Sequence, residues 1–124
     1  MDPRRSVGRR GEDEAARFLR RHGFVILDRN VRSRLGEIDL VARDGETLVF
    51  VEVKTRRESE GDSPQAAVTV GKQRRLGRLA QHYLKLKRLG EAPCRFDVVA
   101  ITLDDADRTK AIRHLRAAFE VAAW

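Results

Sequence analysis

The sequence has little of what secreted or membrane-inserted proteins are built from. Its 124 residues include a single cysteine, Cys94, which excludes an internal disulfide and any cysteine-based zinc site. No apolar stretch follows the amino terminus, so no signal peptide is predicted. No run approaches the roughly 20 apolar residues of a membrane-spanning helix. We therefore expect a soluble, cytoplasmic protein that has no membrane partner. Its length suits one domain at residues 7–124, after a disordered basic start at residues 1–6.

A glycine-rich phosphate loop and an internal repeat are also missing, whereas basic residues are abundant. Lysine and arginine total 26 against 19 aspartates and glutamates, which gives a formal net charge of +7. Most of these basic residues are arginines, which bind phosphate in a bidentate manner. Such a composition fits a nucleic-acid-binding surface, although an arginine-rich proteome would give the same charge.

Residues 36–56 are the most informative stretch. Two apolar runs flank Asp44-Gly45, which predicts a β-hairpin with a two-residue type I′ turn. This turn would pair Arg43 with Glu46 and would continue the ladder so that acidic residues face one another. Because side chains alternate along a strand, one face would be apolar. The other face would carry Glu37, Asp39, Glu52 and Lys54.

The charges on this second face are costly if the sheet needs only stability. Like charges that oppose each other across a sheet destabilise it. Three carboxylates and a lysine on one patch are instead typical of a divalent-cation site, and oxygen ligands of this kind suit Mg²⁺ or Mn²⁺. The alternative is a solvated strand face on which Lys54 bridges Glu52 and Asp39. The residues alone leave both interpretations open.

An acid followed by Glu-x-Lys on the next strand resembles the PD-(D/E)xK nuclease superfamily, with Asp39 as the first acid and residues 52–54 as the Glu-x-Lys. Further blocks at residues 10–12, 29–32, 36–40, 49–54 and 95–99 are similar to those of the YraN family of functionally uncharacterised bacterial proteins. That family in turn resembles archaeal Holliday-junction resolvases. The resemblance covers most of the chain. One departure is that Ile38 replaces the proline before the first acid, and this proline would supply no metal ligand.

The resemblance implies an α/β fold with a restriction-endonuclease-like αβββαβ core, in which helices flank a mixed central sheet. It implies a metal-dependent endonuclease that hydrolyses DNA phosphodiester bonds, with branched or junction DNA as one candidate substrate. Asp39, Glu52 and Glu12 would be catalytic residues that hold Mg²⁺ or Mn²⁺, and Lys54 would be the catalytic lysine. A homodimer is the assembly common among small resolvase-like nucleases, and the sequence shows no dimer surface.

The remaining chain predicts the elements around this hairpin. Helices are expected at residues 7–22 and 72–89, strands at 24–28 and 95–103, and a polar loop at 58–64. An edge strand at 111–115 and a short helix at 116–123 complete the chain. Glu12 shares the buried stripe of the first helix with Ala16 and Leu19, which favours a role in the site. Its early position also suits the helix dipole.

Several basic residues are candidates for nucleic-acid contacts, and each is also compatible with a plain solvated surface. These are Arg32, Arg34, Arg56, Lys72 and Arg75. Asp97 interrupts an apolar strand, and structural and functional roles for it are equally supported. The three histidines lack ligand spacing and are expected in packing or at the surface.

Two rival functions remain. The first is a nucleic-acid-binding protein that keeps the nuclease fold without cutting. The second is an interaction protein with a salt-bridged surface hairpin. Clustered acids repel phosphate, which speaks against a pure binder.

Overall fold

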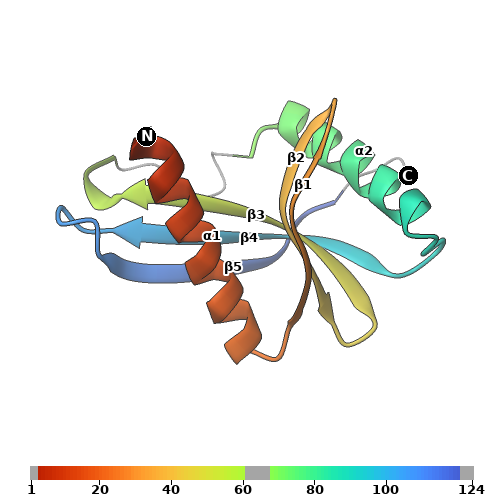
Figure 1. Cartoon of the computed structure of the whole chain (residues 1–124), viewed down its shortest axis with the longest axis horizontal. Coiled ribbons are helices and arrows are strands. Elements are labelled where there is room, and N and C mark those ends of the chain that lie inside the picture. The colour runs from red at the N-terminus through yellow and green to blue at the C-terminus, as the bar shows by residue number, and fades with distance from the viewer. Residues whose placement is uncertain (1–2, 61–67, 121–124) are drawn as a thin grey trace.

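A computed structural model describes residues 3–60 and 68–120 (Figure 1). The elements follow the order α1 (Pro3–Arg21), β1 (Val25–Ser33), β2 (Gly36–Asp44), β3 (Thr47–Arg57), a 3₁₀ turn (Glu58–Glu60), α2 (Val70–Leu86), β4 (Cys94–Leu103) and β5 (Thr109–Phe119). The predicted α/β class and restriction-endonuclease-like core, a mixed sheet flanked by helices, are confirmed. Neither described helix is both long enough and apolar enough to cross a membrane.

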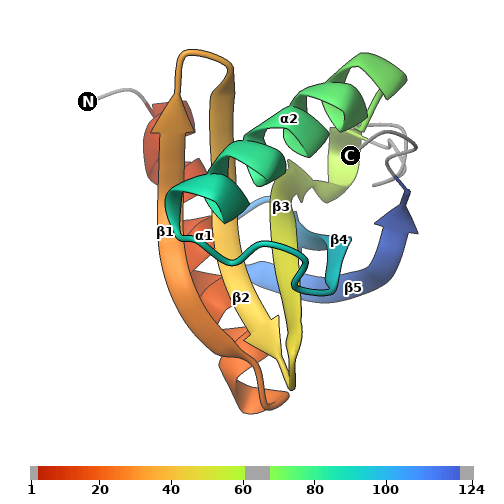
Figure 2. The same ribbon diagram turned by 90° about the vertical axis from the view of Figure 1, so that its right-hand side faces the viewer.

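The five strands form one sheet in the order β1-β2-β3-β4-β5. Strands β3 and β4 are parallel, and every other neighbouring pair is antiparallel. A parallel pair needs a crossover connection, and α2 lies within it. Figure 2 shows α2 in front of the sheet and α1 behind it. The two helices therefore cover opposite faces.

Each helix buries one apolar cluster against its own face of the sheet. On the α1 face, Ala15, Ala16 and Leu19 pack against Leu40, Ala42, Val49, Val51, Val99 and Ile101. On the α2 face, Leu76, Leu79 and Tyr83 pack against Val41, Leu48, Phe50 and Phe96. The near-continuous burial of β4 matches the prediction of a central strand covered on both sides.

The β2–β3 hairpin forms, but the predicted register is wrong by two residues. Asp44 pairs with Thr47 and Val41 with Phe50, so the turn is Gly45-Glu46 rather than Asp44-Gly45. Gly45 is the only turn residue with positive φ, at 62°. This fits a type II′ turn, which needs glycine at its first central position. The carboxylates stay close together, but the predicted single apolar face is wrong: Leu40 packs in the cluster on the α1 face, whereas Ile38 packs in the cluster on the α2 face.

Three further segments differ from expectation. Helix α1 begins at Pro3, so residues 3–6 of the expected disordered start are helical, while residues 1 and 2 lie outside the described part of the chain. Strand β1 extends to Ser33 and includes the arginine-rich segment that was expected to be a connection. The expected loop at 58–64 begins as a 3₁₀ turn, and residues 61–64 lie outside the described part.

The carboxyl-terminal prediction is wrong in part. A strand does form after the Asp104–Arg108 turn, but it continues to Phe119 in place of the expected helix at 116–123. Phe119 stacks on Phe96 of β4 with ring centroids 5.0 Å apart. Pairing with β4 outweighs the helix propensity of the alanines here. Residues 121–123 lie outside the described part.

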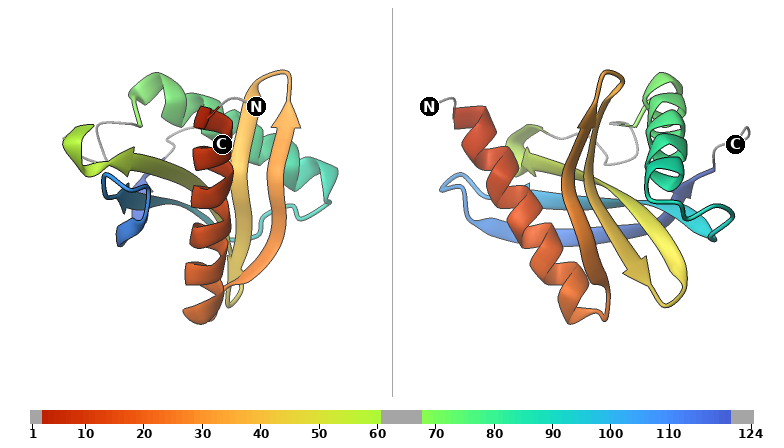
Figure 3. Two further views of the ribbon diagram at one scale, coloured as in Figure 1. Left: turned by 60° about the vertical axis from the view of Figure 1, so that its left-hand side comes forward. Right: turned by 45° about the vertical axis from the view of Figure 1, so that its right-hand side comes forward.

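The β1–β2 hairpin stands between the two helices (Figure 3). Its turn, the start of α1 and the start of α2 lie at the same end of the molecule in every view.

Candidate active site

A pocket of about 510 Å³ opens beside the first half of α1. Its walls come from α1, β2, β3 and the end of β4. Among the lining residues are Glu12, Asp39, Glu52 and Lys54. All four residues predicted to be catalytic therefore line one pocket, although they come from three elements. A second hollow shares Gly8 and Glu12 with it and is lined by Arg9, Asn30, Arg32 and Glu37.

Asp39 lies where β2 and β3 separate. The last ladder pair is Leu40 with Val51, and beyond it the Asp39 carboxyl accepts a hydrogen bond from the Val53 backbone N–H at 2.8 Å. The Asp39 side chain thus takes the place of the backbone hydrogen bond that would continue the β2–β3 ladder. The two strands diverge from this point, which leaves room for the pocket.

The same position is electrostatically unfavourable for a carboxylate. Burial, followed by the nearby Glu52, raises the pKa of Asp39 to about 8, and Glu12 and Glu37 add to the effect against the Val53 hydrogen bond. Desolvation and like charges both disfavour the ionised form. Ionisation of Asp39 is therefore costly without a nearby cation, and a bound cation would favour the ionised form.

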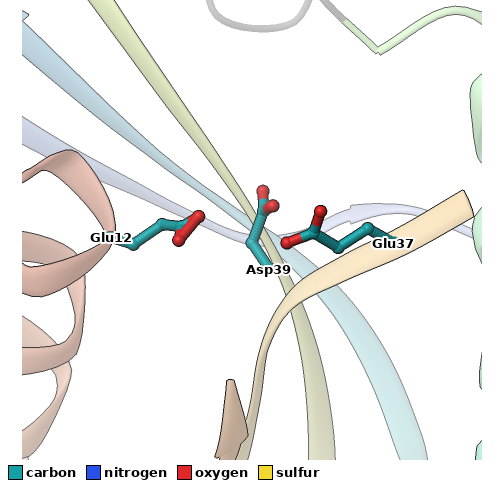
Figure 4. A group of neighbouring side chains, drawn as sticks. All are labelled: Glu12, Glu37 and Asp39. Carbon is teal, nitrogen blue, oxygen red and sulfur yellow. The ribbon is translucent and has the colours of Figure 1, made fainter. Parts of the chain in front are cut away.

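Glu12, Glu37 and Asp39 form a compact acidic group. Each offers a carboxylate oxygen, and these oxygens all lie within 4.8 Å of one another. In Figure 4, Glu12 approaches Asp39 from α1 and Glu37 approaches it from β2 on the other side. An all-oxygen donor set of this size matches the ligands that Mg²⁺ and Mn²⁺ prefer. Two of the three acids that the resemblance implies as ligands, Glu12 and Asp39, belong to this group, whereas its third member is Glu37 and not Glu52. The oxygen donors present fit the metal that the resemblance implies.

Glu52 has a different environment. It is buried in β3, and its carboxylate lies 2.6 Å from the Nζ atom of Lys72. Lys72 is in the first turn of α2, where Thr69 caps the helix by accepting a hydrogen bond from the Lys72 backbone N–H. The ammonium group of Lys72 thus supplies positive charge to a carboxylate that burial alone would destabilise.

The sequence that builds this site matches a known family. A family model described as an uncharacterised protein family, UPF0102, matches residues 11–101.

The chain belongs to UPF0102.

This is the group that the sequence blocks indicated under the name YraN, so the resemblance is confirmed. A UPF0102 protein of Syntrophotalea carbinolica is 49% identical over 123 residues, which cover 98% of this chain and 97% of the relative. One from Geobacter sulfurreducens is 51% identical over 116 residues, covering 94% and 90%. One from Symbiobacterium thermophilum is 59% identical over 99 residues, covering 78% and 82%.

The residues predicted to contact nucleic acid in this UPF0102 chain have different surroundings. Arg56 lines it, and Arg34 is exposed in the β1–β2 turn. The Arg32 Nε atom lies 3.5 Å from Glu37. Arg75 is exposed on α2 and lies so close to Gly36 that a Cβ there would meet its Cδ atom at 3.2 Å. Lys72 differs from the others because its partner, Glu52, is one of the residues predicted to be catalytic.

Sequence reasoning missed Asn30 as a site residue. Its side-chain amide contacts both Glu12 and Glu37. The available signal was an asparagine inside a strand, where this residue type is uncommon. Strand β1 was expected to end before it, so the residue was assigned to a loop.

Sequence reasoning left Asp97 undecided and placed His114 in packing or at the surface. Both lie in a buried network that does not line the pocket. The Asp97 carboxylate contacts His114 Nε2 at 2.7 Å and accepts hydrogen bonds from Arg95 and from the Ala117 backbone N–H. Its role here is structural.

Proposed function

We propose that this UPF0102 protein is a metal-dependent endonuclease that hydrolyses phosphodiester bonds in DNA, with branched DNA as a candidate substrate. The observation that carries the proposal is the convergence of Glu12, Asp39, Glu52 and Lys54 on one pocket. Three acids and a lysine from α1, β2 and β3 are the residue types that this reaction needs, and the pocket opens among basic residues.

Asp39, Glu52 and Glu12 would hold one or two Mg²⁺ or Mn²⁺ ions. The bound metal supplies a water molecule of lowered pKa and positive charge for the phosphoryl oxygens. In hydrolysis the oxygen of a water molecule bonds to phosphorus, the bond from phosphorus to one sugar oxygen breaks, and the departing oxygen takes up a proton. Lys54 places an ammonium group beside the phosphate, where negative charge develops in the transition state.

The surroundings favour a polyanionic substrate. Both helices begin at the end of the molecule where the β1–β2 turn lies (Figure 3), and a helix amino terminus carries partial positive charge. Arg34 and Arg75 are exposed at the β1–β2 turn and on α2. Contacts of this kind bind phosphates without reading sequence. A homodimer would provide two sites for paired cuts.

A second candidate is a nucleic-acid-binding protein that does not cut. The ion pair between Lys72 and Glu52 favours it, because a lysine already neutralises one acid of the site. The raised pKa of Asp39 favours it as well, since a protonated carboxyl needs no cation.

Cleavage of linear, flapped and four-way-junction DNA in Mg²⁺ and in Mn²⁺ separates the two candidates. Asp39→Asn and Glu52→Gln should each lower cleavage by about 10²-fold or more, the order seen when one preorganised electrostatic group is removed. Glu46→Gln is the matched control because Glu46 is exposed in the β2–β3 turn. Binding without any metal-dependent cutting, together with variants that bind equally well, would support the second candidate.

A further inference from the structure

Asn30 has an unusual backbone for a residue inside a strand. Its φ is 53°, in the left-handed region that asparagine tolerates better than most residues. The neighbouring pairs are Arg29 with Leu40 and Val31 with Ile38. Asn30 therefore lies across from Asp39, the centre of the acidic group.

The side chain of Asn30 joins two acids from different elements. Its Nδ2 atom lies 2.8 and 3.1 Å from the two oxygens of Glu12, and 2.6 Å from Glu37 Oε1. Carboxylate oxygens accept hydrogen bonds, so the NH₂ end of the amide must face them. With two N–H groups, the amide can donate one to each acid.

The preceding residue provides a natural comparison. Arg29 contacts Asp13 of α1, just as Asn30 contacts Glu12. Consecutive residues of β1 thus hold consecutive residues of α1. The Arg29 contact ties the helix to the strand at the surface, whereas the Asn30 contact does so inside the site.

We propose that Asn30 is a positioning residue: it uses Glu37 as an anchor and holds the Glu12 carboxylate toward Asp39. This inference rests on the proposed function, since it concerns the metal-holding acids of that site. Groups that orient metal ligands through hydrogen bonds change metal affinity without touching the metal. Glu37 can serve as this anchor because one of its oxygens contacts Asn30 and the other lies 3.5 Å from Arg32 Nε.

The test measures Mn²⁺ binding to the full chain by electron paramagnetic resonance, without DNA. Asn30→Gly removes the side chain and accommodates the positive φ without strain. It should raise the Kd for Mn²⁺ about 10–100-fold. Arg29→Ala breaks the neighbouring tether and should stay within about 2-fold of wild type. Arg88→Gly makes the same backbone change at φ 56°, beyond the end of α2, and should also stay near wild type.

A double-mutant cycle separates positioning from a general structural role. In a Glu37→Ala background the anchor is gone, so adding Asn30→Gly should change the Kd by no more than about 2-fold. A second measurement needs no change at residue 30. The side-chain amide signals of Asn30 in the ¹⁵N–¹H NMR spectrum should move in Glu37→Ala and stay in place in Arg29→Ala.

The outcomes are distinct. If Asn30→Gly binds Mn²⁺ like wild type while Asp39→Asn loses binding, the inference fails and the proposed function stands. The inference also fails if Arg29→Ala weakens binding as much as Asn30→Gly, or if the Asn30 amide signals ignore Glu37→Ala. If the wild-type chain shows neither saturable Mn²⁺ binding nor cleavage, the proposed function fails and the inference falls with it.

Discussion

At the scale of single residues, two aspartates behave in opposite ways. Asp39 is partly buried and surrounded by other acids, and desolvation together with Glu52 raises its pKa to about 8. Asp97 is fully buried, but hydrogen bonds from His114, Arg95 and Ala117 outweigh its desolvation and lower its pKa. The ionised Asp39 carboxylate therefore lowers the stability of the metal-free fold and suits a cation-binding site, whereas the ionised Asp97 carboxylate stabilises the fold.

We expect Asp39→Asn to stabilise the metal-free protein at high pH. The folded state keeps the Asp39 proton up to about pH 8, whereas the unfolded chain releases it near 3.8. Between these values only the folded state binds that proton, so stability falls as pH rises, by at most about 1.4 kcal/mol per pH unit. Asparagine does not titrate and avoids this loss. Urea unfolding in chelator at about pH 5 and about pH 9 should show the variant gaining on wild type as pH rises.

Asp105→Asn provides the control, since Asp105 is an exposed carboxyl in the β4–β5 turn. Its free energy of unfolding should change with pH as that of wild type does. If the free energies of unfolding of Asp39→Asn and wild type differ by the same amount at both pH values, the Asp39 proton is not linked to folding.

Asp97→Ala should have the reverse effect. It leaves Arg95 and His114 without their buried partner, which we expect to cost about 3–5 kcal/mol of stability near neutral pH. Because the pKa of Asp97 is lowered, its contribution is present above the unfolded-state pKa and is lost as pH falls toward the folded-state value. Urea midpoints measure this loss. Mn²⁺ affinity should stay unchanged in the folded fraction, and weakened affinity there would contradict a purely structural role.

At the scale of elements, the closest approach between α1 and the sheet fixes where Glu12 lies. Gly11 is buried, and a Cβ there would lie only 2.0 Å from Thr55 Oγ1 on β3. No Cβ fits in that space unless the Thr55 side chain or the helix moves. The glycine lets α1 approach the strand that carries Glu52 and Lys54, and the next residue, Glu12, reaches the pocket.

Gly11→Ala should therefore destabilise the protein, although alanine favours helix. Overpacking of this kind typically costs about 1–3 kcal/mol, against a gain in helix propensity of about 1 kcal/mol. Gly8→Ala makes the same change on the same helix with nothing within 4 Å, and should stabilise. Adding Thr55→Ala to Gly11→Ala should restore part of the loss, since the nearest remaining atom is Thr55 Cβ at 3.3 Å. Thermal unfolding compares the variants, and equal effects at Gly8 and Gly11 would contradict the argument.

Elements also show where sequence reasoning succeeds and where it fails. The helices and the apolar strand around Val99 follow from periodicity and burial, which are local properties. The hairpin register does not, because both Asp44-Gly45 and Gly45-Glu46 satisfy a turn rule and the choice depends on distant partners. Asp44 is drawn into the strand, where its carboxylate binds Arg95 at 2.9 Å.

The acids of the hairpin were predictable from the sequence, because Glu52 and Asp39 lie close together whether the strands pair in the predicted register or in the observed one. The position of Asn30 was not predictable, because its left-handed backbone appears only when β1 continues past Asp28 beside β2. The strand at residues 116–119 was not predicted either, because its pairing with β4 depends on a change of register beside Asp97 that no local pattern indicates.

At the scale of the whole molecule, the chain carries a formal net charge of +7, and the proposed function places DNA at the end where both helices begin. If this end binds DNA, affinity should fall with salt in proportion to the number of phosphates contacted. Arg34→Ala and Arg75→Ala should each lower the slope of log Kd against log salt by about 1. Arg21→Ala, in the last turn of α1, removes the same charge at the other end of that helix and should change the slope little. Fluorescence anisotropy with labelled DNA measures these slopes, and equal changes in all three variants would indicate diffuse charge instead of a defined binding face.

The parallel pairing of β3 with β4 has a consequence for biosynthesis. Every acid and lysine proposed for the reaction lies between residues 12 and 54, and all of them are synthesised before α2. Yet β3 pairs with β4 from Leu48 to Arg57, and the partner strand ends only at Leu103. A nascent chain that stops short of β4 leaves β3 with an unpaired edge. The segment that carries Glu52 and Lys54 is then not yet held in place, so the proposed site would be assembled only when synthesis is nearly complete.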